Sequence, residues 1–413
     1  MSICISSLAA LGVLATVPAA LAQIAFDVAG KPVQAHTFGS QGFAYSNRNN
    51  YLTMKTAAGS FAFTDLGANV SMQLTDRLRV GAQWYTRNVG EIGNWRPEVD
   101  WAMADYRVRD WFGIRGGKVK TAVGLFNDTQ DLQFLHTWAL PPTSVYSIDA
   151  RGDTIAHWGA DLYGNIGLRK AGALSYTVYG GQRPSDMQGG FVYGLETSSM
   201  VTTPSGPVYL IGVGKKIESY GGPVYGADLR WTTPVPGLLA GASYMKLDTT
   251  TRGYYTTNQY PYLNETLNNK IIALYSQWTA GSLTVNAEYR KENRDTRYNS
   301  ANGSLAAPSI RNSRQGYVTV AYRLAKWLEV GTYHSRFVLN WHMNHGDPRN
   351  HIFDQAVTAR FDLTKYFDLK VEGHWLDGAM INSGLNRGFY AAPNPDGLSP
   401  TMRLLVVRIG FHI

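Results

Sequence analysis

Histidine and aspartate side chains gather in one polar stretch near the C-terminal end of the chain. The stretch holds His334, His342, His345 and His351, with Asp347 and Asp354 beside them. Such side chains can coordinate a metal ion or form an acid–base pair for hydrolysis. Their spacing fits such a site no better than it fits a solvated loop. No Walker loop occurs, and no dinucleotide-binding fingerprint follows a strand. The sequence therefore predicts no catalytic residue, no metal ligand and no cofactor.

A larger set of charged residues is spaced in a way that suits the steering of ions. They fall at alternate positions of the segments interpreted below as strands, which places them on one face of each strand. The basic members are Arg79, Arg87, Arg107, Lys118, Lys120, Arg230, Arg290, Arg323, Arg360, Lys370 and Arg408. The acidic members are Asp65, Asp105, Asp161, Asp228, Glu288, Glu329, Asp362 and Glu372. Eleven bases against eight acids leave this face positive by three charges.

Unpaired charges are very costly inside a dry core, so we expect this face to line a water-filled lumen. The alternative is that the charges pair across strands and fill a narrow barrel. A barrel of sixteen strands is too wide to be filled by side chains alone.

One long segment, Leu125 to Asp153, is acidic. It contains Asp128, Asp131, Asp149 and Asp153, with only Arg151 opposing them. Folded into the lumen, this third long loop would narrow the passage and select polar solutes by charge and size. The alternative is a loop that packs outside the barrel or is mobile.

The elements that would position these residues are strands, because the recurring pattern has period two. Leu66, Ala68, Val70, Met72 and Leu74 share one face, and polar residues alternate with them. Thr75 to Arg77 then reverses the chain, and the next segment alternates in the same way. Most segments are 8 to 12 residues long, near the length that a tilted strand needs to cross a bilayer.

Short and long connections alternate along the chain. Seven short reversals lie at Thr75 to Arg77, Arg109 to Trp111, Arg169 to Gly172, Thr233 to Gly237, Ala280-Gly281, Ala325 to Trp327 and Thr364 to Tyr366. Longer polar stretches include Leu125 to Asp153, Gln182 to Gly222, Asp248 to Asn269, Glu292 to Arg314 and Asp377 to Pro400. This asymmetry is typical of transmembrane barrels with short periplasmic turns and long extracellular loops.

We predict about sixteen strands. Seven turns with a strand on each side give fourteen, and two more are a last strand from Met402 to Ile413 and a weak first one within Ala35 to Asn47. An extra hairpin at Val208 to Gly214 would change the count by two. The fold class is all-β, a transmembrane antiparallel barrel. A soluble sandwich or propeller also alternates, but here aromatic residues crowd the strand ends, as interfacial girdles do.

The N-terminal segment predicts export. Ile3 to Ala22 carries no charge and ends Ala20-Leu21-Ala22, a small-x-small cleavage pattern. We therefore expect residues 1–22 to be a cleaved signal peptide and residues 23–413 to form the barrel. The mean hydropathy of −0.21 excludes a bundle of membrane helices. The net charge of +8 is spread along the chain and not gathered into a nucleic-acid-binding patch.

Two stretches carry a resemblance to a known family. Gly116 to Asp131, reading GGKVKTAVGLFNDTQD, and Trp231 to Tyr244, reading WTTPVPGLLAGASY, resemble hairpins of Gram-negative porins related to the phosphate-selective and other trimeric diffusion porins. The resemblance implies a sixteen-stranded outer-membrane barrel, an inward third loop and a homotrimer. Such porins usually end in Phe or Trp, whereas this chain ends Phe411-His412-Ile413.

The resulting expectation is a non-enzymatic outer-membrane channel for small hydrophilic or anionic solutes, surrounded by lipid and with a modest anion preference. We expect the constriction to be formed by Asp128, Asp131, Asp149 and Arg151. A channel selective for phosphate or sugars is the alternative, since inward Tyr85, Trp101, Tyr163, Tyr317 and Tyr333 could stack on pyranose rings. These rings are more simply explained as packing against the third loop. An adhesin or hydrolase is a further alternative.

Overall fold

The computed structural model describes residues 24–413, apart from 29, 198–199, 204–205, 210–213, 300–301, 305–308 and 381–386. The signal peptide predicted over residues 1–22 lies outside the described residues. No described helix is long and apolar enough to cross a membrane.

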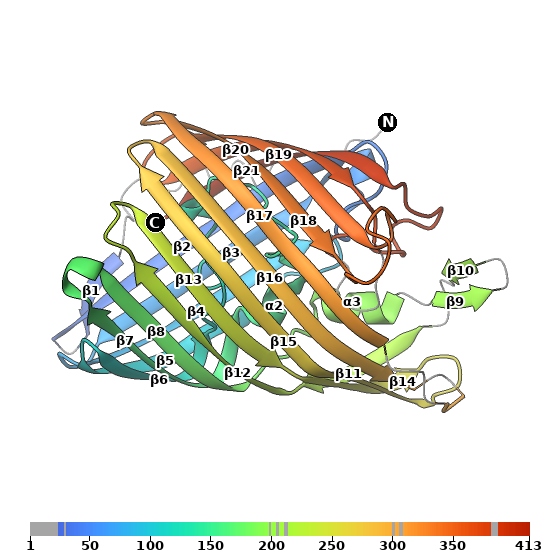
Figure 1. Ribbon diagram of the computed structural model, residues 1–413, viewed down its shortest axis with the longest axis horizontal. Helices are drawn as coiled ribbons and strands as arrows, with labels where there is room; N and C mark the ends of the chain where they lie inside the picture. Colours follow the sequence, from blue (N-terminus) through green and yellow to red (C-terminus); the bar gives the residue numbers. More distant parts are fainter. Residues whose placement is uncertain are drawn as a thin grey trace.

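Sixteen strands form one closed antiparallel barrel, which confirms the predicted fold class and strand number (Figure 1). In ring order they are β2 (Lys31–Ser46), β3 (Ser60–Gln73), β4 (Leu78–Val89), β5 (Glu98–Arg109), β6 (Phe112–Lys120), β7 (Ala156–Gly167), β8 (Ala173–Gln182), β12 (Pro223–Thr232), β13 (Leu238–Leu247), β15 (Pro261–Ala280), β16 (Leu283–Tyr298), β17 (Ser309–Ala325), β18 (Leu328–Val338), β19 (His351–Asp362), β20 (Phe367–Asp377) and β21 (Thr401–His412). Strand β2 pairs with β21 and closes the ring, with Phe38 opposite His412.

Five further strands extend the ring or lie outside it. Strand β1 (Ile24–Val28) pairs with the first residues of β2. Strands β11 (Lys215–Gly221) and β14 (Thr249–Tyr255) pair with each other, and β14 pairs with the first half of β15. Strands β9 (Met200–Thr203) and β10 (Gly206–Tyr209) form a separate hairpin within the fourth loop. This hairpin adds no strand to the ring. The hairpin considered at Val208 to Gly214 lies mostly outside the described residues.

All seven predicted short reversals connect neighbouring strands of the barrel. In the turn between β12 and β13, Gly237 has a positive φ of 75°, and an added Cβ would collide with the carbonyl oxygen of Thr279. Only glycine suits this position without strain. The turn lies at the end of the barrel that carries the other short connections, which is the periplasmic end of such barrels.

Two of the predicted long loops are wrong, because the strands continue through them. Strands β14 and β15 occupy most of Asp248 to Asn269, and only residues 256–260 connect them. Strand β16 likewise reaches Tyr298 and β17 begins at Ser309. Beyond the lipid no face needs to be apolar, so the period-two signal fades while the backbone pairing continues.

The outer face of the ring carries exposed apolar side chains. Leu162, Val178, Leu274, Val318 and Val357 are each more than 40% exposed. The aromatic residues predicted to form girdles are exposed as well, including Trp84, Trp111, Trp231, Trp278, Trp327 and Trp375. Such an exterior on a closed barrel is suited to lipid.

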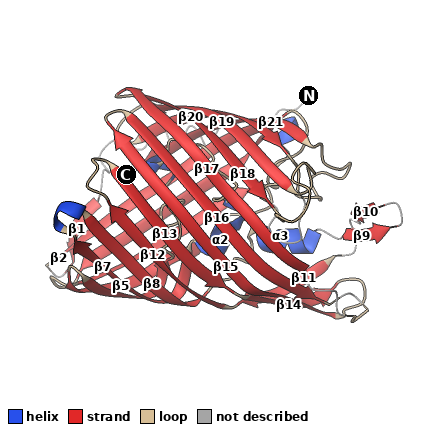
Figure 2. Cartoon of the chain, viewed as in Figure 1, coloured by secondary structure: helices blue, strands red, loops and turns tan. Residues whose placement is uncertain are grey.

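Loops fill much of the long-loop half of the interior, where Figure 2 shows helices α2 (Arg151–Thr154) and α3 (Gly190–Thr197) within the outline of the barrel. Helix α3 buries Val192 and Leu195 against Ile217, Tyr220 and Tyr262. A second apolar cluster joins the first, second, third and eighth loops to the inner wall. Its largest members are Tyr51, Leu52, Met54, Ile92, Leu140, Phe389 and Tyr390.

Replacing Val178 by Arg tests which face meets lipid. Val178 lies on the outer face of β8 and is 49% exposed. An arginine facing the bilayer midplane costs about 2–4 kcal/mol, so the free energy of unfolding should fall by that order. Urea titration of protein folded into phosphatidylcholine vesicles measures it. Thr177→Arg, on the lumenal face of the same strand, should cost clearly less; equal losses would contradict the assigned facing.

Candidate functional site

The third loop, residues 121–155 between β6 and β7, runs through the interior of the barrel. Many of its side chains are buried, among them Val123, Asn127, Asp131 and Leu140. The loop therefore lies inside the lumen, as predicted, and its contacts with the wall decide what space is left for a solute.

The first residues of the loop are held by the wall formed by β12 to β16. The backbone N–H of Gly124 donates to Ser243 Oγ at 2.8 Å, and that of Leu125 donates to Glu288 Oε2 at 3.2 Å. In the opposite sense, Arg230 Nη2 donates to the carbonyl oxygen of Gly124 at 3.2 Å. Both kinds of backbone group thus find a partner on a charged or polar side chain of the wall.

The middle of the loop is held by the wall formed by β19 to β21. Lys370 Nζ donates to the carbonyl oxygen of Gln133 at 2.6 Å and to that of Trp138 at 3.3 Å. Glu372 accepts the backbone N–H groups of Ala139 and Leu140, each at 3.0 Å.

Two arginines add to this attachment. Arg360 Nη1 donates to the carbonyl oxygens of Phe134 at 2.8 Å and His136 at 3.0 Å. Arg408 Nη1 donates to that of Ala139 at 2.9 Å. Charged side chains that were expected to face water instead hold the loop backbone.

The four predicted constriction residues have different surroundings. Asp131 is buried and accepts hydrogen bonds from Lys120 at 2.7 Å and Gln83 at 2.6 Å. Asp128 lies 3.8 Å from Arg230 and borders the open lumen. Arg151 donates to Asp100 on the wall at 2.7 Å, and its guanidinium lies 3.9 Å above the ring of Tyr85.

Asp149 contacts the eighth loop. It accepts hydrogen bonds from Tyr390 Oη at 2.6 Å and from the backbone N–H of Gly388 at 3.0 Å, both in the eighth loop. Asp149 therefore joins two loops and does not lie opposite a basic wall residue.

The carboxyl group of Asp131 in the third loop has a lowered pKa. Burial alone would raise the pKa of this carboxyl, but the nearby Lys120 ammonium and Arg151 guanidinium hold it below its usual range. Asp131 is therefore ionised at neutral pH and balances the charge of Lys120.

All eight predicted acids of the wall have a basic or histidine partner within 3.3 Å, which is the pairing that the sequence left open. The pairs are Asp65–Arg408, Asp105–Arg115, Asp161–His157, Asp228–Arg230, Glu288–Arg290, Glu329–Arg323, Asp362–Arg323, Asp362–Arg360 and Glu372–His374. Arg87 pairs with Asp186 of the fourth loop, and Lys370 lies 3.7 Å from Asp368. Of the predicted bases that reach the lumen, Arg79 and Arg107 form no ion pair with any described carboxylate.

A cavity of about 570 Å³ remains inside the barrel on the side of the short turns. Five basic and three acidic residues are among those that line it: Arg79, Arg107, Arg115, Lys120, Arg230, Asp105, Asp128 and Asp228. The charged lining is thus positive by two. Arg79 and Arg107 are exposed within it.

Lys118 is a correction to the predicted wall, because it projects from the outer face. It pairs across the sheet with Trp158, which is 52% exposed, and its Nζ donates to the carbonyl oxygen of Val99 at 2.6 Å. Arg115, Gly117 and Val119 alternate inward along β6, and Lys120 at its end reaches Asp131 in the lumen. The prediction missed Arg115, because Val119 resembles a lipid-facing residue although it is buried beside the loop.

Three of the predicted inward aromatic residues contact the third loop. Tyr333 lies 4.9 Å from Trp138 and Tyr317 lies 6.1 Å from Tyr146, between ring centroids, and Tyr85 lies beneath Arg151. Trp101 and Tyr163 line the cavity, with Arg115 over the ring of Tyr163.

The histidines of the C-terminal stretch do not converge. His334 is exposed on the outer face, His345 contacts the carbonyl oxygen of Trp341, and His351 is buried against Phe353. His342 lies 3.3 Å from the amide of Asn312. Asp347 pairs with Arg349, and Asp354 lies on the inner wall beside His374. Within the described ranges, no cluster of His, Cys, Asp or Glu has the arrangement of a metal site.

Comparison with known proteins finds similar structures only. No family model and no curated protein matches the chain. Outer-membrane expressed OmpT of Vibrio cholerae superimposes with a TM-score of 0.54 at 9% identity over 94% of this chain and all of that one. An in-vitro folded form of the same protein is described as a trimer.

Two channels are similar as well. The anion-selective porin from Comamonas acidovorans has a TM-score of 0.52 at 12% identity, over 93% of this chain and all of that one. The outer membrane channel DcaP of Acinetobacter baumannii has a TM-score of 0.50 at 11% identity, over 94% and 99% of the two chains. The chain thus has the fold of outer-membrane porins, and its closed ring with an apolar exterior places it in the bacterial outer membrane.

Lys370→Met tests how the third loop is held. The substitution removes the donor to the carbonyl oxygens of Gln133 and Trp138, and buried backbone groups without a partner are costly. Amide hydrogen exchange should therefore become faster in peptides that cover residues 130–142. Lys365→Met, at an exposed turn, is the control and should leave exchange unchanged. Identical exchange in both variants would show that the loop does not depend on this lysine.

Proposed function

We propose that the protein is an outer-membrane channel for the passive diffusion of small hydrophilic solutes, with a modest preference for anions. The charged cavity inside the barrel is the observation that carries the proposal. Polar and charged side chains line it on several strands, and the third loop borders it at Ala122, Asp128 and Leu132. A loop and a wall of this kind select solutes by size and charge.

The anion preference rests on charges that lack a partner. Arg79 and Arg107 supply two such charges in the cavity. Nearer the long-loop end, Arg294 and Arg311 face each other across β16 and β17, and neither pairs with a described carboxylate. Like charges directly opposite on a sheet repel one another, so a passing anion would relieve them. The preference is modest, because most of the other lumenal charges are paired and salt screens beyond about 8 Å at physiological ionic strength.

Rival functions predict different behaviour. A sugar-selective channel would use Trp101, the inward aromatic residue that lines the cavity without a ring or cation stacked on it in the described structure. A phosphate-selective channel would use the unpaired arginines. A hydrolase would need a reachable acid–base pair, but the lumenal contacts His374–Asp354 and His157–Asp161 are almost fully buried. No observation as direct as the charged cavity favours a sugar-selective channel, a phosphate-selective channel, a hydrolase or an adhesin.

A homotrimer is part of the proposal. Support comes from the porin resemblance of two sequence stretches and from the similar OmpT structure described as a trimer. Native mass measurement of protein extracted in mild detergent should give three chains per particle. A monomer that keeps its full conductance would contradict this part of the proposal.

Replacing Arg79 and Arg107 together by Gln tests the anion preference. The two substitutions remove the surplus of two positive charges from the cavity, so the anion preference should fall, and what is left should come from Arg294 and Arg311. Reversal potentials of reconstituted protein in a potassium chloride gradient measure the ratio of chloride to potassium permeability.

Two controls remove charges that do not line the cavity, two charges in the first control and one in the second. Arg77→Gln with Arg109→Gln, at periplasmic turns, and Lys118→Gln, on the outer face, should leave the permeability ratio unchanged. A cation preference in the wild-type protein, or an equal response to the control substitutions, would refute the proposed origin of selectivity.

A further inference from the structure

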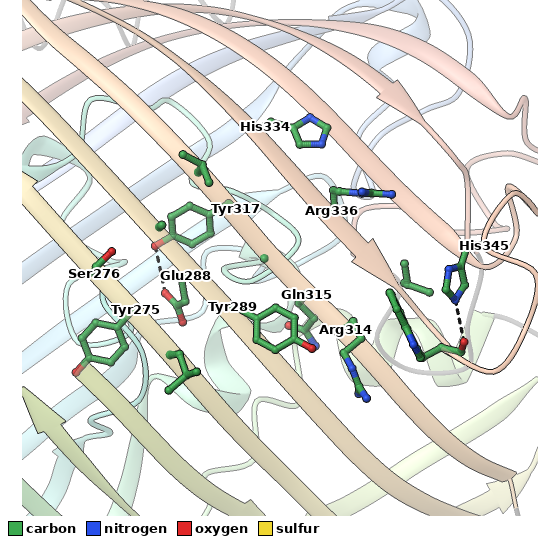
Figure 3. Close-up of a pocket in the computed structure, with 16 residues that line it drawn as sticks. Tyr275, Ser276, Glu288, Tyr289, Arg314, Gln315, Tyr317, His334, Arg336 and His345 are labelled. Atoms are coloured by element: carbon green, nitrogen blue, oxygen red, sulfur yellow. Dashed lines mark hydrogen bonds between the residues drawn. The ribbon is translucent and has the colours of Figure 1, made fainter. Parts of the chain in front are cut away.

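A groove of about 600 Å³ lies on the outside of the barrel, across β15 to β18 and next to the seventh loop (Figure 3). Its exposed lining includes Leu274, Tyr289, Val318, His334 and Arg336, with exposed fractions of 47–56% for the first three. Tyr275, Glu288, Gln315 and Tyr317 also border it, but they are almost fully buried on the lumenal face of these strands. The groove is therefore separate from the channel interior.

Basic side chains surround the end of the groove that is nearer the long loops. Arg314 and Arg336 line it, and Lys291 pairs across the sheet with Arg314. None of the three forms an ion pair with a described carboxylate. Arg314 lies 5.7 Å from the ring of Trp341, and Arg336 lies 4.4 Å from that of Phe353. Aromatic faces thus orient two guanidinium groups on a lipid-exposed surface without neutralising them.

The other part of the groove is apolar and open. Gly316 lies between Tyr289 and Arg336 in the sheet and has no side chain to fill the space between them. Ser276, Ala287 and Val318 continue the floor away from the arginines and toward the middle of the barrel wall. The groove therefore combines a cationic end with an apolar slot.

We propose that this groove binds one phosphorylated lipid of the outer leaflet, with the phosphate at Arg314 and Arg336 and an acyl chain along Gly316 and Ala287. Guanidinium groups bind phosphate oxygens through two parallel hydrogen bonds, and such charge-assisted bonds are the strong ones. The cationic end lies where β17 and β18 meet the long loops, at the level expected for the phosphates of the leaflet that faces outward.

A lipid fits this surface better than the other possible occupants. A transported solute would not reach it, because the groove faces away from the lumen. A protein partner would need acidic residues to match three cations, and the same face of a second copy would bring three more cations. A phosphorylated amphiphile satisfies both the unpaired cations and the apolar slot.

Native mass spectrometry of the detergent-purified full-length protein with bisphosphorylated lipid A tests the proposal. The wild-type protein should retain one lipid per chain at this site, and Arg314→Gln with Arg336→Gln should weaken binding by roughly tenfold or more. Ala287→Phe, which fills the slot and keeps the charges, should weaken binding as well. The same lipid without its phosphates should bind no better to the wild-type protein than to the double variant.

The matched control is Arg403→Gln with Lys118→Gln, which removes two outward-facing charges from other strands and should leave the binding unchanged. Equal weakening by the control would overturn the proposal, and so would competition by inorganic phosphate alone, since that marks a soluble anion site. Ion flux should be normal in the groove variants. The lipid site and the proposed channel function can therefore fail independently.

Discussion

A loop that crosses the interior of a barrel brings its backbone N–H and C=O groups with it, and each of them needs a hydrogen-bond partner away from bulk water. The structure meets this requirement with charged side chains of the wall. Lys370, Arg360 and Arg408 donate to carbonyl oxygens of the third loop, and Glu372 accepts two of its N–H groups. The position of this loop, and so the space left for solutes, depends on these bonds.

The same requirement explains why so few of the charges are free. Each of the eight predicted wall acids lies beside a base or histidine, and the buried Glu292 accepts hydrogen bonds from Ser313 and Gln315 instead. A buried charge is tolerated when it is paired or hydrogen-bonded. What remains for a solute is a small surplus, formed by Arg79 and Arg107 in the cavity and by Arg294 and Arg311 nearer the long-loop end. The proposed channel would therefore discriminate only weakly by charge.

The sequence predicted the fold well, because a strand between lipid and a polar interior alternates in a way that is visible without a structure. The seven turns and the sixteen strands follow from that alternation. The alternation was less informative where one face of a strand passes from one surrounding, such as the open lumen, to another, such as the third loop. Val119 is apolar yet faces inward beneath the third loop, so the facing of Lys118 was predicted wrongly and Arg115 was missed. Strand β14 and the long-loop ends of β15 and β16 show no alternation of apolar residues, so the sequence did not predict them as strands. The apolar cluster of the loops was not predicted either, because it depends on contacts between distant segments, such as that of Tyr51 with Phe389.

In the proposed channel, wall charges hold the third loop across the lumen. Single-channel recording in planar bilayers tests it most directly, with the wild-type protein compared with a variant that carries Arg360→Met and Lys370→Met. We expect discrete conductance steps for the wild-type protein, and larger or noisier steps for the variant, because its loop has lost the bonds of Arg360 and Lys370 to the wall of β19 to β21. The absence of steps in the wild-type protein, or steps of the same size and noise in both, would contradict it.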